Sequence, residues 1–206
     1  MKYILCILIL VTAQLVTAED VQLSTILPRP LFVGTPVPVK ISPLEPPIKG
    51  SIPTFLLPAG VTNIALHKTV TSSDNEPVVG TLDLITDGDK EGDEGSWVEL
   101  GTGTQWIQID LEKEAQLYAL MLWHFHSQER VYSDVKVETS NDPKFITGVT
   151  TVYDNSPGGT NLQYIESYKG KLIDLKGNKA RYIRCSSKGN TTNKMNHYIE
   201  VEVFGQ

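Results

Sequence analysis

The spacing of short β-type runs after residue 59 is the feature that most constrains the fold of this chain. Runs rich in β-branched and aromatic residues alternate there with turn clusters such as SNDPK and DNSPGGTN. Short runs bounded by Gly, Pro, Asn and Asp predict strands, and no window of about 11 residues has strong helical periodicity. About 148 residues with roughly eight to ten such runs predict one all-β sandwich or jelly roll over residues 59–206.

Alternation within these runs predicts which side chains face the core. In DVKVE, Val135 and Val137 occupy alternate positions, and in YIEVEVF the same is true of Ile199, Val201 and Val203. Alternate residues of a strand point to one face of the sheet. Each set is therefore expected to share a buried face.

Other runs carry a different signal. QLYALMLW (116–123) is apolar at both phases, which predicts a central strand covered on both faces. LDLIT (82–86) also has the character of a strand, and Cys185, in the run RYIRC, is expected to be a small buried residue. The tryptophans each adjoin a strand run and are expected in the core or at its rim: Trp97, Trp106 and Trp123.

The first 18 residues have the pattern of a secretory signal peptide. A Lys, a short apolar run and the small-residue site Val16-Thr17-Ala18 predict export to the periplasm, the cell surface or the medium, and the run is too short to span a membrane. Cleavage after Ala18 removes Lys2 and Cys6, so the formal charge of −6 becomes −7 and no internal disulfide can form. An acidic chain is a poor partner for nucleic acid.

Residues 19–58 contain nine of the twelve prolines. Proline fixes φ and lacks a backbone donor, so this stretch is expected to be extended and polyproline-like rather than helical or part of a central strand. Two interpretations remain open. The segment is a stiff spacer, or its apolar residues dock on the following sandwich or on a protein partner.

The stretch ITDGDKEGDEGSW (85–97) crowds five acidic side chains and three glycines together. It is not an EF-hand, because a loop starting at Asp87 would need Glu at position 12, where the chain has Val98, and its flanks have the character of strands. A calcium loop of another kind and a solvated acidic turn both remain open.

A second polar cluster follows the most apolar run. WHFHSQERVYSD (123–134) holds His124, His126, Glu129 and Arg130. On a strand the two histidines would point to the same side, and together with the acid and the guanidinium they suit a ligand site for sugar hydroxyls. Two other readings stay open: a His-x-His transition-metal site with Glu129, and a structural role in which a histidine caps the core and Arg130 pairs with Asp134.

The loop SKGNTTNKMNHY (187–198) precedes the last run and is rich in turn residues. Asn196 and His197 at its end are candidates for the rim of the ligand site. Asn190-Thr191-Thr192 also matches an N-glycosylation sequon, which matters only in a eukaryotic host. An ordinary hairpin loop is the alternative.

Several of these motifs, taken in order, resemble one family. NIALHKTVTSSD, ITDGD, Trp97, QWIQIDLEKEAQLYALMLW, VYSDVKVETSND, ARYIRC and YIEVEVFG resemble the discoidin or coagulation factor (F5/8) type C domain over residues 61–205. More narrowly, the chain with its Pro-rich preface resembles exported discoidin-domain proteins of planctomycete-type bacteria. The resemblance implies a galactose-binding-like jelly roll, a fold shared with fucose-binding lectins and bacterial carbohydrate-binding modules.

The resemblance also implies a structural calcium ion between the acidic loop and the last strand. The ligands it implies are Leu84 (carbonyl), Asp87, Asp89, Ser96 and Glu200, with the carbonyl of Ile199 close by and Asp93 as a substitute for Ser96. Hard oxygens of this number suit calcium. The fucose-binding relatives place a further His after the calcium loop, where this chain has VELGTGTQ and no His.

Two classes of function follow. The first is a secreted, non-catalytic, lectin-like module that binds a glycan or cell-surface polysaccharide and holds a structural calcium. The second is a structural or adhesion protein that binds another protein or the cell envelope without recognising sugar. We do not expect an enzyme, because the chain has no G-x-S-x-G, HExxH or phosphate-binding glycine loop.

Overall fold

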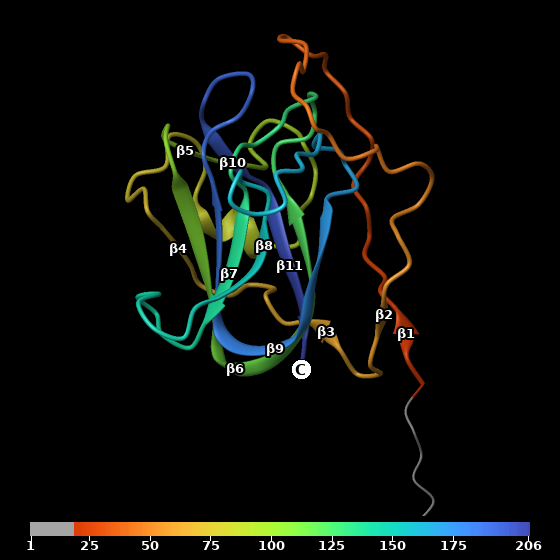
Figure 1. Ribbon diagram of the computed structural model, residues 1–206, viewed down its shortest axis with the longest axis vertical. Coiled ribbons are helices and arrows are strands. Elements are labelled where there is room, and N and C mark those ends of the chain that lie inside the picture. The colour runs from red at the N-terminus through yellow and green to blue at the C-terminus, as the bar shows by residue number, and fades with distance from the viewer. Residues whose placement is uncertain (1–18) are drawn as a thin grey trace, which may run out of the picture.

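The computed structural model describes residues 19–206, and the signal-peptide prediction lies outside this range. Within the described residues the regular structure is β apart from one short 3₁₀ helix, η1 (Leu82–Thr86) (Figure 1). The strands are β1 (Val21–Gln22), β2 (Leu56–Leu57), β3 (Thr62–Asn63), β4 (Val70–Ser72), β5 (Val98–Leu100), β6 (Gln105–Trp123), β7 (Lys136–Ser140), β8 (Thr150–Asp154), β9 (Lys171–Ser187), β10 (Asn196–Tyr198) and β11 (Glu200–Gly205). The all-β prediction is confirmed.

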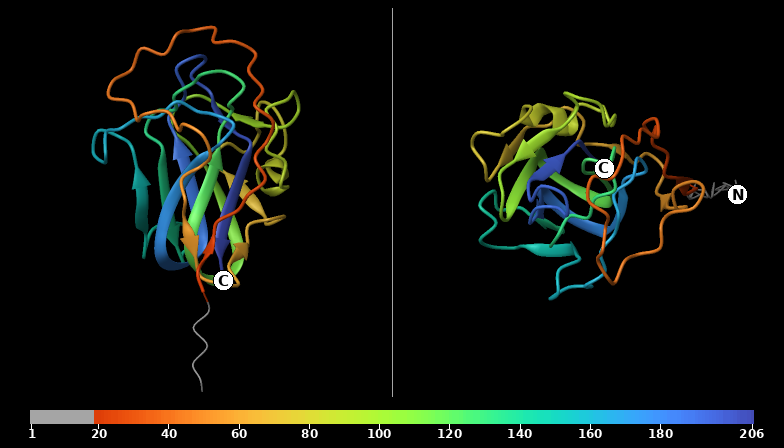
Figure 2. Two further views of the ribbon diagram at one scale, coloured as in Figure 1. Left: turned by 90° about the vertical axis from the view of Figure 1, so that its right-hand side faces the viewer. Right: turned by 90° about the horizontal axis from the view of Figure 1, so that it is seen from above.

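Two long antiparallel strands, β6 and β9, form the frame of the sandwich. The first half of β6 pairs with β4 and its second half with β11, while β9 pairs with β6 along both halves and with β7 near its end. The β6–β9 register is interrupted between Asp110 and Ala115, where Glu112 has a φ of 69°. Both strands bend there, so one seven-stranded ladder folds into two facing layers (Figures 1 and 2).

The sequence runs that were expected to be separate strands are therefore continuous. QWIQIDL and QLYALMLW both belong to β6, and GKLIDL and ARYIRCSS both belong to β9. The polar residues between them, such as Glu112, Lys113 and Glu114 of β6, stay within the strand, although the register break at the bend leaves these three without cross-strand partners.

LDLIT is the helix η1 and not a strand. Residues three apart lie above one another in a 3₁₀ helix. Ile85 is fully buried in the core, and Leu82 packs against the same core. A single helical turn therefore places Ile85 in the core and packs the half-buried Leu82 and Leu84 against it.

The main core lies between the two layers and includes most of the predicted positions. Val135, Val137 and Cys185 are fully buried there, as expected. Val201 and Val203 of β11 join them, but Ile199 does not, because it lies in the break between β10 and β11 and packs on the opposite face of the sheet.

The second half of β6 is covered on both faces, as QLYALMLW predicted. Leu120 and Leu122 face the main core, while Ala119, Met121 and Trp123 belong to a second apolar cluster on the outer face. Leu23 and Leu57, from the N-terminal segment (residues 19–58), are buried in that second cluster. The N-terminal segment therefore docks on the sandwich through its apolar residues, which is one of the two interpretations that the sequence left open.

The N-terminal segment runs from one end of the sandwich to the other and back (Figures 1 and 2). Its ends are joined by the pairing of β1 with β2. In between, Arg29 forms ion pairs with Glu91 and Asp93 of the acidic loop. Polar contacts thus add to the apolar docking.

The tryptophans lie in three settings. Trp123 is fully buried, and its Nε1–H donates to the carbonyl of Tyr168 over 3.0 Å. Trp97 is half-buried against the second cluster. Trp106 is half-buried beneath the guanidinium of Arg184. In residues 19–206 no helix is long and apolar enough to cross a membrane.

Candidate functional site

The acidic loop lies against the start of the last strand. Asp87 ends η1, and the next N–H, of Gly88, donates to Oε2 of Glu200 over 3.2 Å. Oδ1 of Asp87 accepts a hydrogen bond from the N–H of Asp89 (2.8 Å), and Ser96 Oγ lies 3.5 Å from Oδ2 of Asp89. The implied link between this loop and Glu200 is present.

Glu200 has no exposed surface, and its Oε1 has no hydrogen-bond partner. Burial raises its pKa to about 9, and the nearby carboxyl groups of Asp87 and Glu202 add to the increase. Burial also raises the pKa of Asp87, with a contribution from Asp89. A buried carboxyl group with an unpartnered oxygen is unfavourable unless a cation compensates it.

The fit to calcium is partial. Within residues 19–206 no three His, Cys, Asp or Glu side chains gather as a metal site, so Asp87, Asp89 and Glu200 do not converge as a set of three. The transition-metal reading of His124, His126 and Glu129 fails on the same observation. The unpartnered oxygen of Glu200 and the buried Asp87 remain as the features that suit a cation.

The two histidines of WHFHSQERVYSD contact different neighbours. β6 ends at Trp123, so strand geometry does not align their side chains. His124 is fully buried, stacks on Tyr132 at 4.3 Å, and lies with Nδ1 2.7 Å from Oε1 of Glu166. It is part of the interior rather than a surface ligand.

His126 holds the acidic loop. Its Nε2–H donates to the carbonyl of Lys90 over 2.9 Å, and Ser127 Oγ–H donates to the carbonyl of Gly92 over 2.7 Å. A Cβ at Gly92 would collide with the Ser127 hydroxyl, so the close approach requires glycine. Glu129 is exposed. The loop after β6 is thus fixed to the acidic loop.

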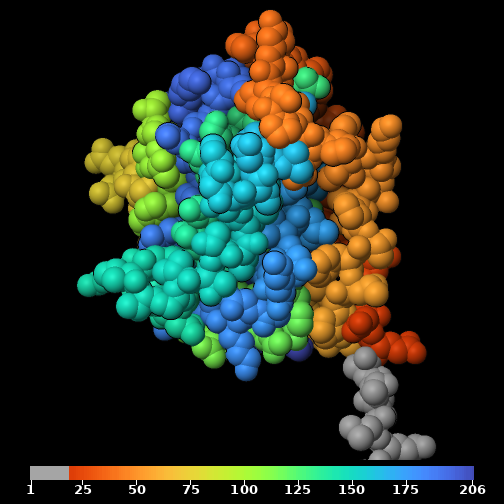
Figure 3. Space-filling view, viewed as in Figure 1, coloured from red at the N-terminus to blue at the C-terminus, as the bar shows by residue number. Residues whose placement is uncertain are grey.

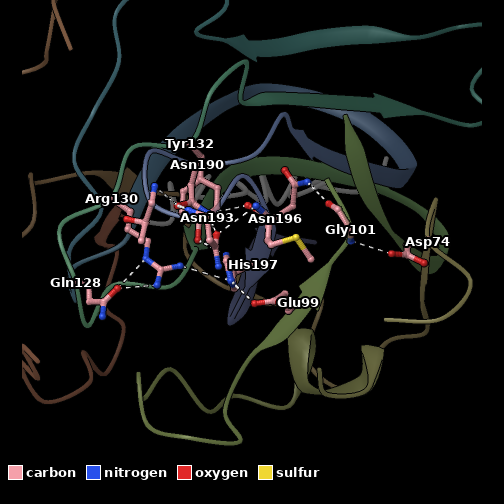
Figure 4. Close-up of polar contacts among 12 residues, drawn as sticks. Asp74, Glu99, Gly101, Gln128, Arg130, Tyr132, Asn190, Asn193, Asn196 and His197 are labelled. Atoms are coloured by element: carbon pink, nitrogen blue, oxygen red, sulfur yellow. Dashed lines mark hydrogen bonds and ion pairs between the residues drawn. The ribbon is translucent and has the colours of Figure 1, made fainter. Parts of the chain in front are cut away.

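Arg130 belongs to a polar cluster at the loop end of the sandwich, where it lies between Gln128 and His197 (Figure 4). Its Nε and Nη2 donate to Oε1 of Gln128 over 3.2 and 2.6 Å, and its guanidinium lies 4.4 Å from the ring centroid of Phe125. Asp134 lies nearest Lys188, at 3.8 Å, so the predicted Arg130–Asp134 pair is wrong.

His197 connects Arg130 to a carboxyl group. Its Nε2 lies 2.7 Å from Oε2 of Glu99, and its Nδ1 lies 2.8 Å from the hydroxyl of Tyr132. Burial, aided by Arg130, lowers the pKa of His197 to about 3, and burial raises the pKa of Glu99. The ring is therefore neutral at pH 7.

Because the imidazole of His197 is neutral, only one of its two ring nitrogens carries a proton. A carboxylate only accepts, so Nε2 carries the proton that it donates to Glu99, and Nδ1 accepts from the Tyr132 hydroxyl. Nη1 of Arg130, 3.5 Å from Nε2 of His197, then finds no acceptor on this ring. One edge of the guanidinium retains donor capacity for a ligand.

The side chains of Asn196 and Asn190 make hydrogen bonds within and between the loops and do not point to a ligand. The amide of Asn196 accepts from Ser187 and Gly189 and donates to the carbonyls of Gly101 and Gly103. Asn190 is 2 % exposed, and its Nδ2 donates to Asn193 Oδ1 and the Met195 carbonyl. The sequon asparagine is therefore not accessible for glycosylation in the folded chain.

Of the six predicted ligand residues, Arg130 and His197 come together, with Asn196 supporting their loops. The partners that sequence reasoning missed are Glu99 and Gln128. Glu99 lies between the buried residues Val98 and Leu100 in β5, so its side chain points away from the core. Its contact with His197 depends on the pairing of β5 with β10, two strands far apart in the chain.

Two facing antiparallel layers joined by bent strands, with polar loops gathered at one end, define a galactose-binding-like jelly roll. The chain belongs to the F5/8 type C domain family, whose model matches residues 68–201. A comparison with curated proteins found no match.

Solved structures share this fold. A chitosan-binding module of a chitosanase/glucanase from Paenibacillus sp. IK-5 is 24% identical with a TM-score of 0.53, covering 70% of this chain and 99% of that chain. A fucose binding module of Streptococcus pneumoniae is 24% identical with a TM-score of 0.50, covering 69% and 96%. A family 89 glycoside hydrolase of Clostridium perfringens is 22% identical with a TM-score of 0.54, covering 70% of this chain and 14% of the enzyme.

Proposed function

We propose that this chain is a non-catalytic carbohydrate-binding module, and that it binds glycan at the cluster of Glu99, Gln128, Arg130 and His197. The observation that carries the proposal is the guanidinium edge of Arg130, which retains donor capacity beside the carboxyl group of Glu99. Adjacent donors and acceptors are what a sugar hydroxyl pair requires.

An aromatic surface adjoins the cluster. The rings of Trp97 and Phe125 pack edge to face at 4.9 Å, and Phe125 lies 5.9 Å from the ring of His197. Trp97 is only half-buried, so part of the indole remains open for the C–H face of a sugar ring. The chitosan-binding and fucose binding modules of the same fold support the ligand class.

We further infer that a structural calcium ion binds between the acidic loop and Glu200. Asp87 and Glu200, with the carbonyl oxygens of Leu84 and Ile199, would hold it, and Asp89 with Ser96 or Asp93 would complete the ligand set. Calcium would supply the positive charge that the unpartnered oxygen of Glu200 lacks. Bound there, it would also order the loop that His126 contacts.

Export is part of the proposal. It rests on the sequence of residues 1–18, whose apolar run and small-residue site have the pattern of a signal peptide. An exported protein would meet cell-surface glycans and polysaccharides outside the cytoplasm.

A second candidate function is adhesion to a protein or to the cell envelope. The observation that favours it is the exposure of apolar side chains on the N-terminal segment, at Phe32, Val33 and Val37. Exposed apolar residues that cluster along one segment are typical of interaction surfaces. This function would depend on the segment and not on Arg130.

A glycan array with matched variants separates the two candidates. We expect Arg130→Lys to weaken glycan binding by about tenfold or more, because lysine keeps the charge but loses the planar fork. Arg181→Lys, on a partly exposed arginine paired with Asp110, is the control and should bind as the unaltered chain does. Glycan binding that is equal in both variants, or absent in all chains, would remove the proposed site.

A further inference from the structure

Two neighbouring valines lie exposed beside the polar cluster of Arg130. Val78 and Val79 belong to the segment between β4 and η1, and they are 58% and 38% exposed. Figure 3 shows this segment (yellow) projecting at the left of the molecule, beside the yellow-green residues around β5. Single exposed apolar side chains are common on protein surfaces, but two of them next to a polar site indicate a contact surface.

Backbone hydrogen bonds join these valines to Glu99 of β5. The N–H groups of Val78 and Val79 both donate to the carbonyl of Glu99, over 2.7 and 3.4 Å, and the N–H of Glu99 donates to the carbonyl of Val79 over 2.9 Å. Two residues thus oppose one, which is the pattern of a β-bulge. A bulge interrupts the alternation of a strand and re-aims side chains, which accounts for the exposure of two adjacent valines.

The segment that carries the valines is fixed at both ends. Oδ2 of Asp74 accepts a hydrogen bond from the N–H of Gly101 over 2.8 Å (Figure 4). At the other end Gly80 has a φ of 74°, and a Cβ there would collide with the carbonyl of Trp97, so this close approach requires glycine. The valines are therefore held in place before a ligand arrives, which lowers the entropy cost of binding.

Val79 continues a row of side chains across β5 and β10. Val79 lies opposite Glu99, and Glu99 lies opposite His197, in antiparallel pairs. Side chains of directly opposed residues lie on the same face of a sheet. Nε2 of His197 in turn lies 3.5 Å from Nη1 of Arg130. The row therefore runs from Arg130 through His197 and Glu99 to Val79, and Figure 4 shows its first three members in succession.

Exposure to solvent increases along this row. Arg130 and His197 are buried, the Glu99 side chain is 17% exposed, and Val79 is 38% exposed. Oε2 of Glu99 accepts from His197, and within residues 19–206 no hydrogen bond reaches its Oε1. A ligand whose polar groups meet Arg130 and Glu99 therefore has open surface beside it on the side of Val79.

We propose that the ligand is an oligosaccharide chain end, with its terminal sugar at Arg130 and Glu99 and its second sugar over Val78 and Val79. This inference rests on the glycan function proposed above and adds a second subsite to it. Valine side chains make no hydrogen bonds, so the second sugar contacts them through the C–H groups of its ring.

The charges around the valines favour a neutral second sugar. Glu99 lies beside Val79, and Asp74 and Glu76 belong to the same segment as the valines. A carboxylate on the second sugar would be repelled by these acids. The ligand class is therefore an oligosaccharide whose second unit is uncharged, and not a free monosaccharide.

Matched pairs of probes test the length of the ligand. Methyl glycosides of glucose, galactose, mannose, fucose and N-acetylglucosamine are each compared with a disaccharide that carries the same sugar at its non-reducing end. For each sugar that binds, we expect the disaccharide to bind about fivefold tighter in titration calorimetry, the equivalent of covering part of one valine side chain. Equal affinities within every pair would overturn the second subsite and leave the glycan function standing. Binding by none of the probes would remove the glycan function, and this inference with it.

Variants then locate the second subsite. Val79→Ser should abolish most of the advantage of the disaccharide. Val149→Ser, at a residue with the same 38% exposure in the loop between β7 and β8, is the matched control and should keep that advantage. Arg130→Lys should weaken both members of a pair alike, because it acts on the terminal sugar. An advantage that survives in Val79→Ser would overturn the assignment of the valines.

A charged probe tests the polarity of the second subsite. A disaccharide with glucuronate as its second unit should bind more weakly than its counterpart with glucose in that position, owing to repulsion from Glu99. The difference should shrink in Glu76→Gln, since that variant removes one of the nearby acids. Equal affinities for the two disaccharides in the unaltered chain would refute the preference for a neutral second sugar.

Discussion

The ammonium of Lys90 lies 2.8 Å from Oε1 of Glu202, and both side chains are only 8% exposed. The pair joins the acidic loop to β11 through the interior. Lys90 belongs to the loop whose acids are expected to bind calcium, so it provides a cation of the chain's own close to Glu200.

Breaking this pair should destabilise the chain. Lys90→Met leaves Glu202 buried without its cation, and we expect the free energy of unfolding in urea to fall by about 3–5 kcal/mol. The double variant Lys90→Met/Glu202→Met should recover much of that loss, because it removes both buried charges. A double variant as unstable as the sum of the two single variants would contradict this account.

Glu200→Gln should have opposite effects with and without calcium. In a chelator it removes a buried carboxyl group whose charged form burial disfavours, and we expect stability to rise by about 1–3 kcal/mol. With excess calcium the unaltered chain should gain about 3 kcal/mol at a hundredfold excess over Kd, and the variant should gain little. Glu94→Gln, on an exposed acid of the same loop, is the control for thermal unfolding. A calcium response retained in Glu200→Gln would rule out the ligand set.

The neutral His197 predicts a loss of stability in mild acid. Its folded pKa of about 3 lies below the unfolded value of 6.5, so below about pH 6.5 only the unfolded chain gains a proton here. Stability from this residue is complete above pH 6.5 and falls by roughly 1–2 kcal/mol by pH 5. In urea unfolding at several pH values, His197→Gln should show a shallower loss between pH 6.5 and 5. The same slope in both chains would refute the assignment.

Two neighbouring leucines test whether the N-terminal segment is part of the folded unit. Leu57 is 3% exposed and Leu56 is 60% exposed. Leu57→Ala should lower the free energy of unfolding by about 2–5 kcal/mol, whereas Leu56→Ala should change it by less than about 0.5 kcal/mol. Near-identical stabilities would mean that the segment behaves as a spacer and not as a docked element.

Sequence patterns predicted the sandwich well because alternation and turn residues act locally. Val135 and Val137 are buried as expected, and QLYALMLW is covered on both faces. The prediction failed at LDLIT, where Leu82 and Leu84 are two apart, as on one face of a strand, while Leu82 and Ile85 are three apart, as on one face of a 3₁₀ turn. It also failed at Ile199, because a one-residue break between β10 and β11 moved the side chain to the other face.

The candidate site was harder to predict because its contacts join distant segments. Sequence reasoning selected Arg130 and His197 as polar residues on loops, but nothing local links Glu99 to His197. His124 was predicted to be a ligand because His124 and His126, two residues apart, were expected to point to the same side of a strand. Its burial against Glu166, 42 residues later, was not visible from its own neighbourhood.

The bends of β6 and β9 also determine which way the molecule presents its loops. The first described residues and the C-terminus both lie at the end of the sandwich where these strands bend, opposite the loops after β6 and before β10 (Figure 1). The second half of β6 separates the two ends by ~30 Å at 3.3 Å per residue. A partner, a surface or a reporter domain attached through either terminus would therefore lie at the end of the sandwich opposite the Arg130 cluster and would not cover that cluster.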